Sequence, residues 1–124
     1  MKHFLLIGTL LIILTGCGGE KVHENISEGI ATDAKQILEI YDIAVKEKRS
    51  FTDDEQYILD DFQLLYGAKE KNGDLSEEES RLFILVRNMI DLDEALVLKE
   101  SEHEDYEAQK KLINSVIKTG EIYN

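Results

Sequence analysis

The 124-residue chain has no proline, no tryptophan and one cysteine, and basic residues are scarce in it. A single cysteine excludes an internal disulfide framework. Only 14 lysine and arginine residues stand against 26 aspartate and glutamate residues, so the net charge is −12. This charge argues against a nucleic-acid partner, which requires a basic surface that neutralises phosphates. Hydrophobic residues make up 43% of the chain, which is enough for the core of one domain.

The first seventeen residues have the layout of a secretory signal. A basic start, residues 1–3, precedes the apolar run 4–14 (FLLIGTLLIIL), and small residues follow up to Cys17. A membrane-spanning helix needs about 20 apolar residues, and this run is shorter. The combination of a basic start, a short apolar run and small residues after it is typical of a signal peptide.

The segment Leu14-Thr15-Gly16-Cys17 resembles the lipobox of bacterial lipoproteins. The resemblance implies that residues 1–16 are removed as a signal peptide and that the thiol of Cys17 carries a diacylglyceryl lipid. The composition, rich in lysine, glutamate and isoleucine, resembles that of Gram-positive lipoproteins, which face outward from the cell membrane. We therefore expect the protein on the extracytoplasmic face of the cell membrane, held there by its lipid.

The rest of the chain divides into a short tether and a domain. Residues 17–25 are polar, contain two glycines and are expected to form the lipidated N-terminus and tether. Residues 26–124 are expected to form one acidic domain. Because anionic lipid repels a negative domain within a Debye length of about 8–10 Å, we expect this domain to stand off the membrane surface.

Apolar residues in the domain follow helical periodicity, and no segment shows the alternation of a strand. Between Ile26 and Ala44 they recur three and four positions apart, which predicts a helix with Ser27 as its N-cap and an end near 48–50. Capping boxes predict two further helix starts, at Thr52–Glu55 and at Ser76–Glu79.

Glycines predict where these helices end. We expect the helix after Thr52 to end near Tyr66, because Gly67 is a typical C-terminal stop. The helix after Ser76 is the most apolar, and we expect it to be the central and most buried one. Its C-terminal end leaves two alternatives: separate helices at 77–100 and 102–118, or one long helix over 77–118, with Gly120 as the final stop.

These elements predict an all-α domain, a small antiparallel bundle of three or four helices. No pattern in it indicates catalysis, because a nucleophile elbow and a glycine-rich phosphate loop are both absent from the sequence. The acidic pairs Asp53-Asp54 and Asp60-Asp61 are adjacent in sequence, so their side chains diverge on a helix. We therefore expect no enzyme activity and no cofactor besides the lipid on Cys17.

Residues 68–79 resemble the twelve-residue calcium loop of an EF-hand. Gly73 falls at the sixth position, where the loop turns sharply, and Glu79 falls at the twelfth, the bidentate ligand position. The first position departs from the pattern, because it is Ala68 instead of aspartate, and the sequence has no second loop of this kind. The alternative is that the same residues turn the chain and cap the next helix. The candidate calcium-binding residues are Glu70, Asn72, Asp74, Ser76 and Glu79.

Together the patterns favour an interaction protein. We expect a lipoprotein that binds another envelope or membrane protein through its acidic helical surface. Small Gram-positive immunity and conjugation-exclusion lipoproteins, which block a partner in the envelope, are an analogy from size and anchor. Two alternatives stay open: a weak calcium-binding module at 68–79, and a structural lipoprotein that self-associates through a long helix at 77–118. Tyrosine is enriched at interfaces, so the candidate anchors include Tyr57, Tyr66, Tyr106 and Tyr123.

Overall fold

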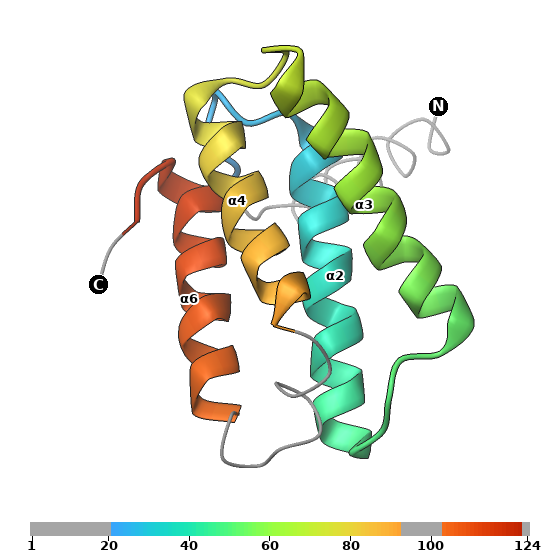
Figure 1. Ribbon diagram of the computed structural model, residues 1–124. Helices are drawn as coiled ribbons and strands as arrows, with labels where there is room; N and C mark the ends of the chain where they lie inside the picture. Colours follow the sequence, from blue (N-terminus) through green and yellow to red (C-terminus); the bar gives the residue numbers. More distant parts are fainter. Residues whose placement is uncertain (1–20, 93–102, 123–124) are drawn as a thin grey trace, which may run out of the picture.

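The structure is a computed structural model that describes residues 21–92 and 103–122. These residues form four α-helices and no strand, which confirms the predicted all-α class for this part of the chain (Figure 1). None of the described helices is long and apolar enough to cross a membrane. Cys17 and Tyr123 lie outside the described residues. The helices are α2 (Glu28–Glu47), α3 (Asp53–Lys71), α4 (Glu77–Asp91) and α6 (His103–Thr119).

Helix α2 buries more described residues than any other helix and contacts all three of the others. Eight of its residues are buried, against four in α4. The prediction that the helix after Ser76 is the most buried is therefore wrong, although α4 also contacts the three other helices. Three of the buried residues of α2 are the alanines Ala31, Ala34 and Ala44, whose small side chains add little to the apolar character by which the sequence ranks the helix after Ser76 first.

Two tyrosines lie in the core with their hydroxyl groups bonded. The rings of Tyr41 and Tyr106 stack with centroids 5.6 Å apart, and both residues are at most 1% exposed. The Tyr41 hydroxyl donates to the carbonyl of Met89 at 3.3 Å, and the Tyr106 hydroxyl donates to the carboxylate of Asp42 and lies 3.1 Å from the carbonyl of Leu38. These bonds remove the cost of burying an unpaired hydroxyl. Tyr106 is therefore a core residue and not an interface anchor.

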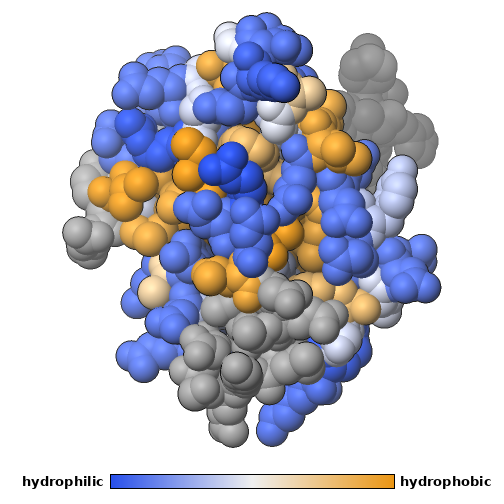
Figure 2. Space-filling model, in the orientation of Figure 1, coloured by the Kyte–Doolittle hydropathy of each residue, from blue (hydrophilic) through white to orange (hydrophobic). Residues whose placement is uncertain are grey.

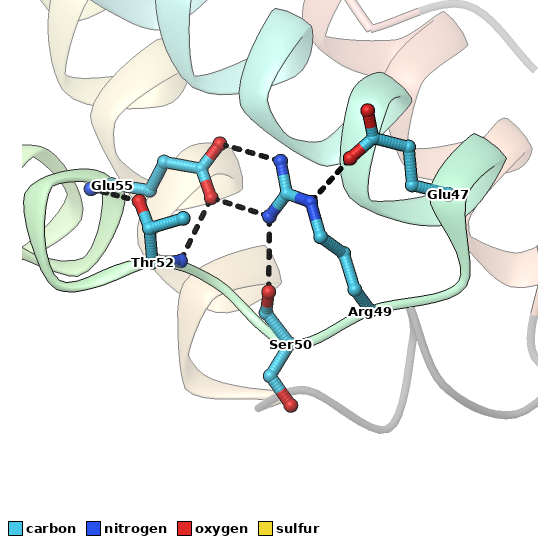
Figure 3. Close-up of polar contacts among 5 residues, drawn as sticks. All are labelled: Glu47, Arg49, Ser50, Thr52 and Glu55. Carbon is cyan, nitrogen blue, oxygen red and sulfur yellow. Dashed lines mark hydrogen bonds and ion pairs between the residues drawn. The ribbon is translucent and has the colours of Figure 1, made fainter.

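The connection from α2 to α3 is fixed by one arginine (Figure 3). Helix α2 ends with Lys48 as its C-cap, within the predicted range 48–50, and Lys48 adopts the left-handed conformation with a φ of 53°. Arg49 then donates to both carboxylate oxygens of Glu55, at 2.7 and 3.2 Å, and also to Glu47. Glu55 completes the capping box with Thr52, which confirms the predicted helix start. The bond from Arg49 is the main reason that the pKa of Glu55 is lowered.

Helix α3 is longer than predicted, because Gly67 lies inside it. The ring of Phe83 packs over this glycine, with its Cζ atom 3.7 Å from the place where a Cβ would stand. This contact with α4 offsets the roughly 0.5–1 kcal/mol that a helical glycine costs relative to alanine. The helix ends instead at Lys71 with Asn72 as its C-cap, and Gly73 follows with a φ of 73°.

The question of one or two helices in the C-terminal third is settled by packing. Helix α4 ends at Asp91, and α6 packs along its side, so a single continuous helix over 77–118 is excluded (Figure 1). Helix α4 thus ends before the predicted end at 100, and the predicted helix start at 102 lies in the segment 93–102, outside the described part of the chain. Gly120 ends α6 as predicted, with a φ of 75°.

The chain before α2 is packed against the bundle. We call residues 22–26 the leading segment; within it, Val22 packs on the core and Ile26 is only 4% exposed. The backbone N–H of His23 donates to the carbonyl of Ile117 in α6 at 2.8 Å. The folded part therefore begins within the predicted tether of residues 17–25, four residues before Ile26.

Candidate functional site

Helix α3 carries apolar side chains on two opposite sides. Leu59, Phe62 and Tyr66 are buried against the other helices. At 3.6 residues per turn, positions 57, 61, 64 and 68 lie on the side opposite to these three. We call this side the outward face of α3; its residues are Tyr57, Asp60, Asp61, Leu64 and Ala68, all of them exposed.

Two residues of the outward face are the most exposed large apolar residues in the described chain. Leu64 is 75% exposed and Tyr57 is 70% exposed, whereas the other exposed large apolar residues reach at most 51%. Single exposed apolar residues are common on protein surfaces. Here the two are seven residues apart on one helix, so they stand two turns apart on the same face. Of the tyrosines proposed as anchors, Tyr57 is thus exposed, while Tyr66 and Tyr106 are buried.

The outward face is acidic between its apolar residues. Asp60 and Asp61 follow Tyr57 by one turn, and Asp53 and Asp54 lie in the exposed first turn of the same helix. In Figure 2, apolar patches alternate with polar side chains on the view that shows α3, α4 and α6. The surface therefore combines apolar contact area with negative charge.

Hollows flank the outward face on both sides. Between α3 and α4 lies an open groove of about 700 Å³, and the residues that line it include Asp60, Leu64 and Phe83. Gly67 leaves room for this groove, and the guanidinium of Arg87 lies 5.4 Å from the centre of the Phe83 ring. On the α2 side a smaller hollow of about 100 Å³ is lined by Tyr57 and Asp61, among others. A partner that covers α3 would find a ridge between two depressions, a shape suited to interlocking side chains.

The residues predicted to bind calcium serve other purposes. The segment 68–71, which would supply the first third of a calcium loop, is helical and belongs to α3. Glu70 accepts a hydrogen bond from the hydroxyl of Ser80. The backbone N–H groups of Asn72 and Asp74 donate to carbonyls of the last turn of α3, at 3.1 and 2.9 Å. The candidate ligands are therefore spread over a helix end, a turn and the next helix start.

Ser76 and Glu79 are the two candidates that the structure brings together, and they form a capping box. The Ser76 hydroxyl accepts from the Glu79 N–H at 3.0 Å and donates to the carbonyl of Asn25 at 2.6 Å. One carboxylate oxygen of Glu79 accepts from the Ser76 N–H at 3.0 Å. The other accepts from the N–H and the hydroxyl of Ser27, at 3.0 and 2.7 Å.

Glu79 therefore joins the starts of two helices through its bonds with Ser27, which lies 52 positions away in the sequence. Burial raises the pKa of Glu79, but the hydrogen bonds from Ser76 and Ser27 outweigh it and leave the pKa below its ordinary value. Ser27 stands at the predicted N-cap position, yet its hydroxyl donates to Glu79 and does not cap α2. Sequence reasoning missed this bond because no local pattern connects residues so far apart.

Among the described residues, no three histidine, cysteine or acidic side chains converge in a way that could hold a metal ion. Comparison of the chain with protein-family models, with curated protein sequences and with solved structures finds no match. The proposals about function therefore depend on the sequence and on the surface of the bundle.

Proposed function

We propose that the protein is a lipid-anchored interaction module on the extracytoplasmic face of the cell membrane. The lipobox resemblance at residues 14–17 supports the lipid on Cys17 and the removal of residues 1–16. The observation that carries the interaction part is the outward face of α3, with Tyr57 and Leu64 exposed two turns apart and acidic residues between them.

The chemistry of this face favours a partner protein with a basic, partly apolar contact segment. Tyrosine supplies large contact area with few rotatable bonds, which is why it is enriched among residues that dominate binding energy. Asp60 and Asp61 would pair with lysine or arginine, and complementary charge raises the association rate and fixes the orientation of the partner. A charge of −12 gives the same preference over the whole molecule.

The bundle supports a binding role through the helix surfaces that it presents. Contacts at one end join the start of α2 to the end of α3 and the start of α4, and these support the predicted antiparallel order. Such a bundle presents rigid helix surfaces. The function resembles that of immunity or conjugation-exclusion lipoproteins, an analogy from size and anchor.

Self-association is the weaker alternative. This alternative requires one long helix over 77–118, and the packing of α4 against α6 excludes such a helix. Pairing two outward faces would also bring Asp60 and Asp61 of one copy against those of another, and like charges that meet at an interface are unfavourable.

Site-specific crosslinking tests the proposed function. A photo-reactive amino acid is placed at Tyr57 or Leu64 of the full-length lipoprotein in membranes of its own host, and at Lys111, an exposed position of α6, as a control. We expect adducts from α3 and not from Lys111, with one membrane or envelope protein whose crosslinked segment is basic. Salt should weaken the association. Equal adducts from both helices, adducts with the protein itself, or a contact segment without basic residues would contradict the proposal.

A further inference from the structure

The leading segment is bound to the bundle by several independent contacts. The side-chain amide of Asn25 donates to Glu78 at 3.2 Å, and the Asn25 carbonyl accepts from Ser76 at 2.6 Å. Val22 and Ile26 pack on the core from either side of these polar contacts. The His23 ring lies against the end of α6, since a Cβ at Gly120 would stand 3.2 Å from it. Residues 22–26 therefore belong to the rigid part of the molecule.

These contacts place the start of the folded chain at one defined end of the bundle. That end contains the last turn of α6, the first turn of α4 and, through a hydrogen bond from Tyr66 to Asp33, the C-terminal part of α3. It lies at the top of Figure 1, where the loop between α3 and α4 is drawn. The connection between α2 and α3, with Arg49, lies at the opposite end.

We infer that this arrangement orients the bundle on the membrane, with the end that holds the leading segment facing the lipid. The inference rests on the proposed lipid at Cys17. Only four peptide units separate Cys17 from Lys21, and an extended chain spans at most roughly 3.3–3.6 Å per residue, or about 14 Å here. The bundle is about twice as long, because α2 has 20 residues at about 1.5 Å each. The tether is therefore too short for the opposite end to reach the surface without a large rotation.

The orientation narrows the kind of partner that α3 fits. Helix α3 then rises from the membrane, with Ala68 nearer to the lipid and Tyr57 farther from it. Its outward face then points along the plane of the membrane and not toward it. The whole face lies within about 45 Å of the lipid, which is the sum of the tether length and the bundle length. The partner segment is accordingly a basic region close to the membrane in a protein of the same membrane.

Energy transfer to a lipid dye measures this orientation directly. The full-length lipoprotein is placed in vesicles of phosphatidylglycerol and phosphatidylethanolamine that contain an acceptor lipid. A donor is attached to a single introduced cysteine, either at K118C, near the leading segment, or at K46C, at the far end of α2; both positions are exposed. We expect the donor at 118 to lie about 25 Å closer to the lipid than the donor at 46, a little less than the length of α2.

An insertion provides the matched control. Ten glycine and serine residues between Lys21 and Val22 leave every contact of the leading segment in place and extend the reach of the tether to about 50 Å. The difference between the two donors should then largely disappear, while the melting temperature stays unchanged. Equal transfer from both donors in the native chain would overturn the orientation, and so would a difference that the insertion leaves intact. Failure to bind vesicles at all would instead contradict the lipid anchor.

Discussion

Replacing Glu79 by glutamine tests whether one carboxylate joins the two helix starts. Its oxygens accept from Ser76 and twice from Ser27. Glutamine keeps one acceptor oxygen and turns an NH₂ group toward an N–H donor, which leaves at least one donor unpaired. Hydrogen bonds to charged groups contribute about 1.5–3 kcal/mol each, and a capping residue about 1 kcal/mol. Because the site is partly exposed, we expect a loss of about 2 kcal/mol in the free energy of unfolding.

Urea unfolding followed by circular dichroism measures this loss, and Glu77→Gln is the matched control. Glu77 stands in the same first turn of α4 but is exposed, with one ion pair to Arg81 at 3.3 Å. Surface pairs of this kind contribute at most about 1 kcal/mol, so the control should lose at most about half as much. An equal loss in both variants would refute the reasoning, because it would assign the effect to the helix dipole alone.

A double-mutant cycle separates the long-range bond from the local cap. Ser27→Ala removes a hydroxyl that donates to Glu79 at 2.7 Å and performs no capping of its own helix. Partners in direct contact show coupling energies of about 0.5–3 kcal/mol. We therefore expect the double variant to be more stable than the sum of the single losses predicts. Additive losses would show that the two side chains do not interact.

The pH dependence of stability has a defined sign for the three glutamates whose pKa is lowered in the folded protein. Glu79, Glu78 and Glu55 all have a pKa below the ordinary 4.5 in the folded protein. A carboxyl with a lowered pKa binds its proton more readily in the unfolded chain, so the stabilisation is complete above pH 4.5 and is lost as the pH falls through the folded value. The gap between the native protein and Glu79→Gln should therefore shrink in acid. A gap that widens below pH 4.5 would contradict this sign.

Three further predictions follow from the glycines, the outward face and the turn. Gly120→Ala should lower the free energy of unfolding more than Gly73→Ala, as measured by chemical denaturation. Both glycines have a positive φ, but only at Gly120 would a Cβ meet another atom, the Cγ of Glu78 at 2.9 Å. Leu64→Ala should change the free energy of unfolding by less than about 0.5 kcal/mol, and Leu59→Ala should lower it by about 2–5 kcal/mol. Millimolar calcium should leave the melting temperature unchanged, because Glu79 already accepts three hydrogen bonds; a rise would show that residues 68–79 bind the ion.

The fold was predictable where local chemistry alone decides. Both capping boxes formed as their sequences indicate, and the left-handed turn at Gly120 ended α6. The errors arose where contacts between distant residues decide. Gly67 is a stop by local propensity, yet Phe83 packs over it and the helix continues. Ser27 stands at a typical N-cap position, yet its hydroxyl donates to Glu79 and does not cap α2.

The candidate site, too, was predictable only in the features that do not depend on contacts between distant residues. An acidic surface follows from composition, and Tyr57 was among the tyrosines proposed as anchors. Sequence alone could not separate it from Tyr66 and Tyr106, because a tyrosine on a periodic helix looks the same whether its hydroxyl meets water or a partner such as Asp33. The pattern at 68–79 is ambiguous for a similar reason. Ser76 and Glu79 fit a calcium loop and a capping box equally well in the sequence, and in the structure they form the capping box.

Helix α3 is the place where sequence pattern and fold disagree most. In α2, α4 and α6 the apolar residues gather mainly on the side that the core uses, with a few partly exposed exceptions. In α3 the core accounts for Leu59, Phe62 and Tyr66 but leaves Tyr57 and Leu64 in water. A sequence that agrees with its fold elsewhere has no folding reason to keep two large apolar residues there, and such local conflicts are expected at functional sites. A partner that covers this face would remove the conflict, which is why the outward face of α3 is the surface on which the proposed function rests.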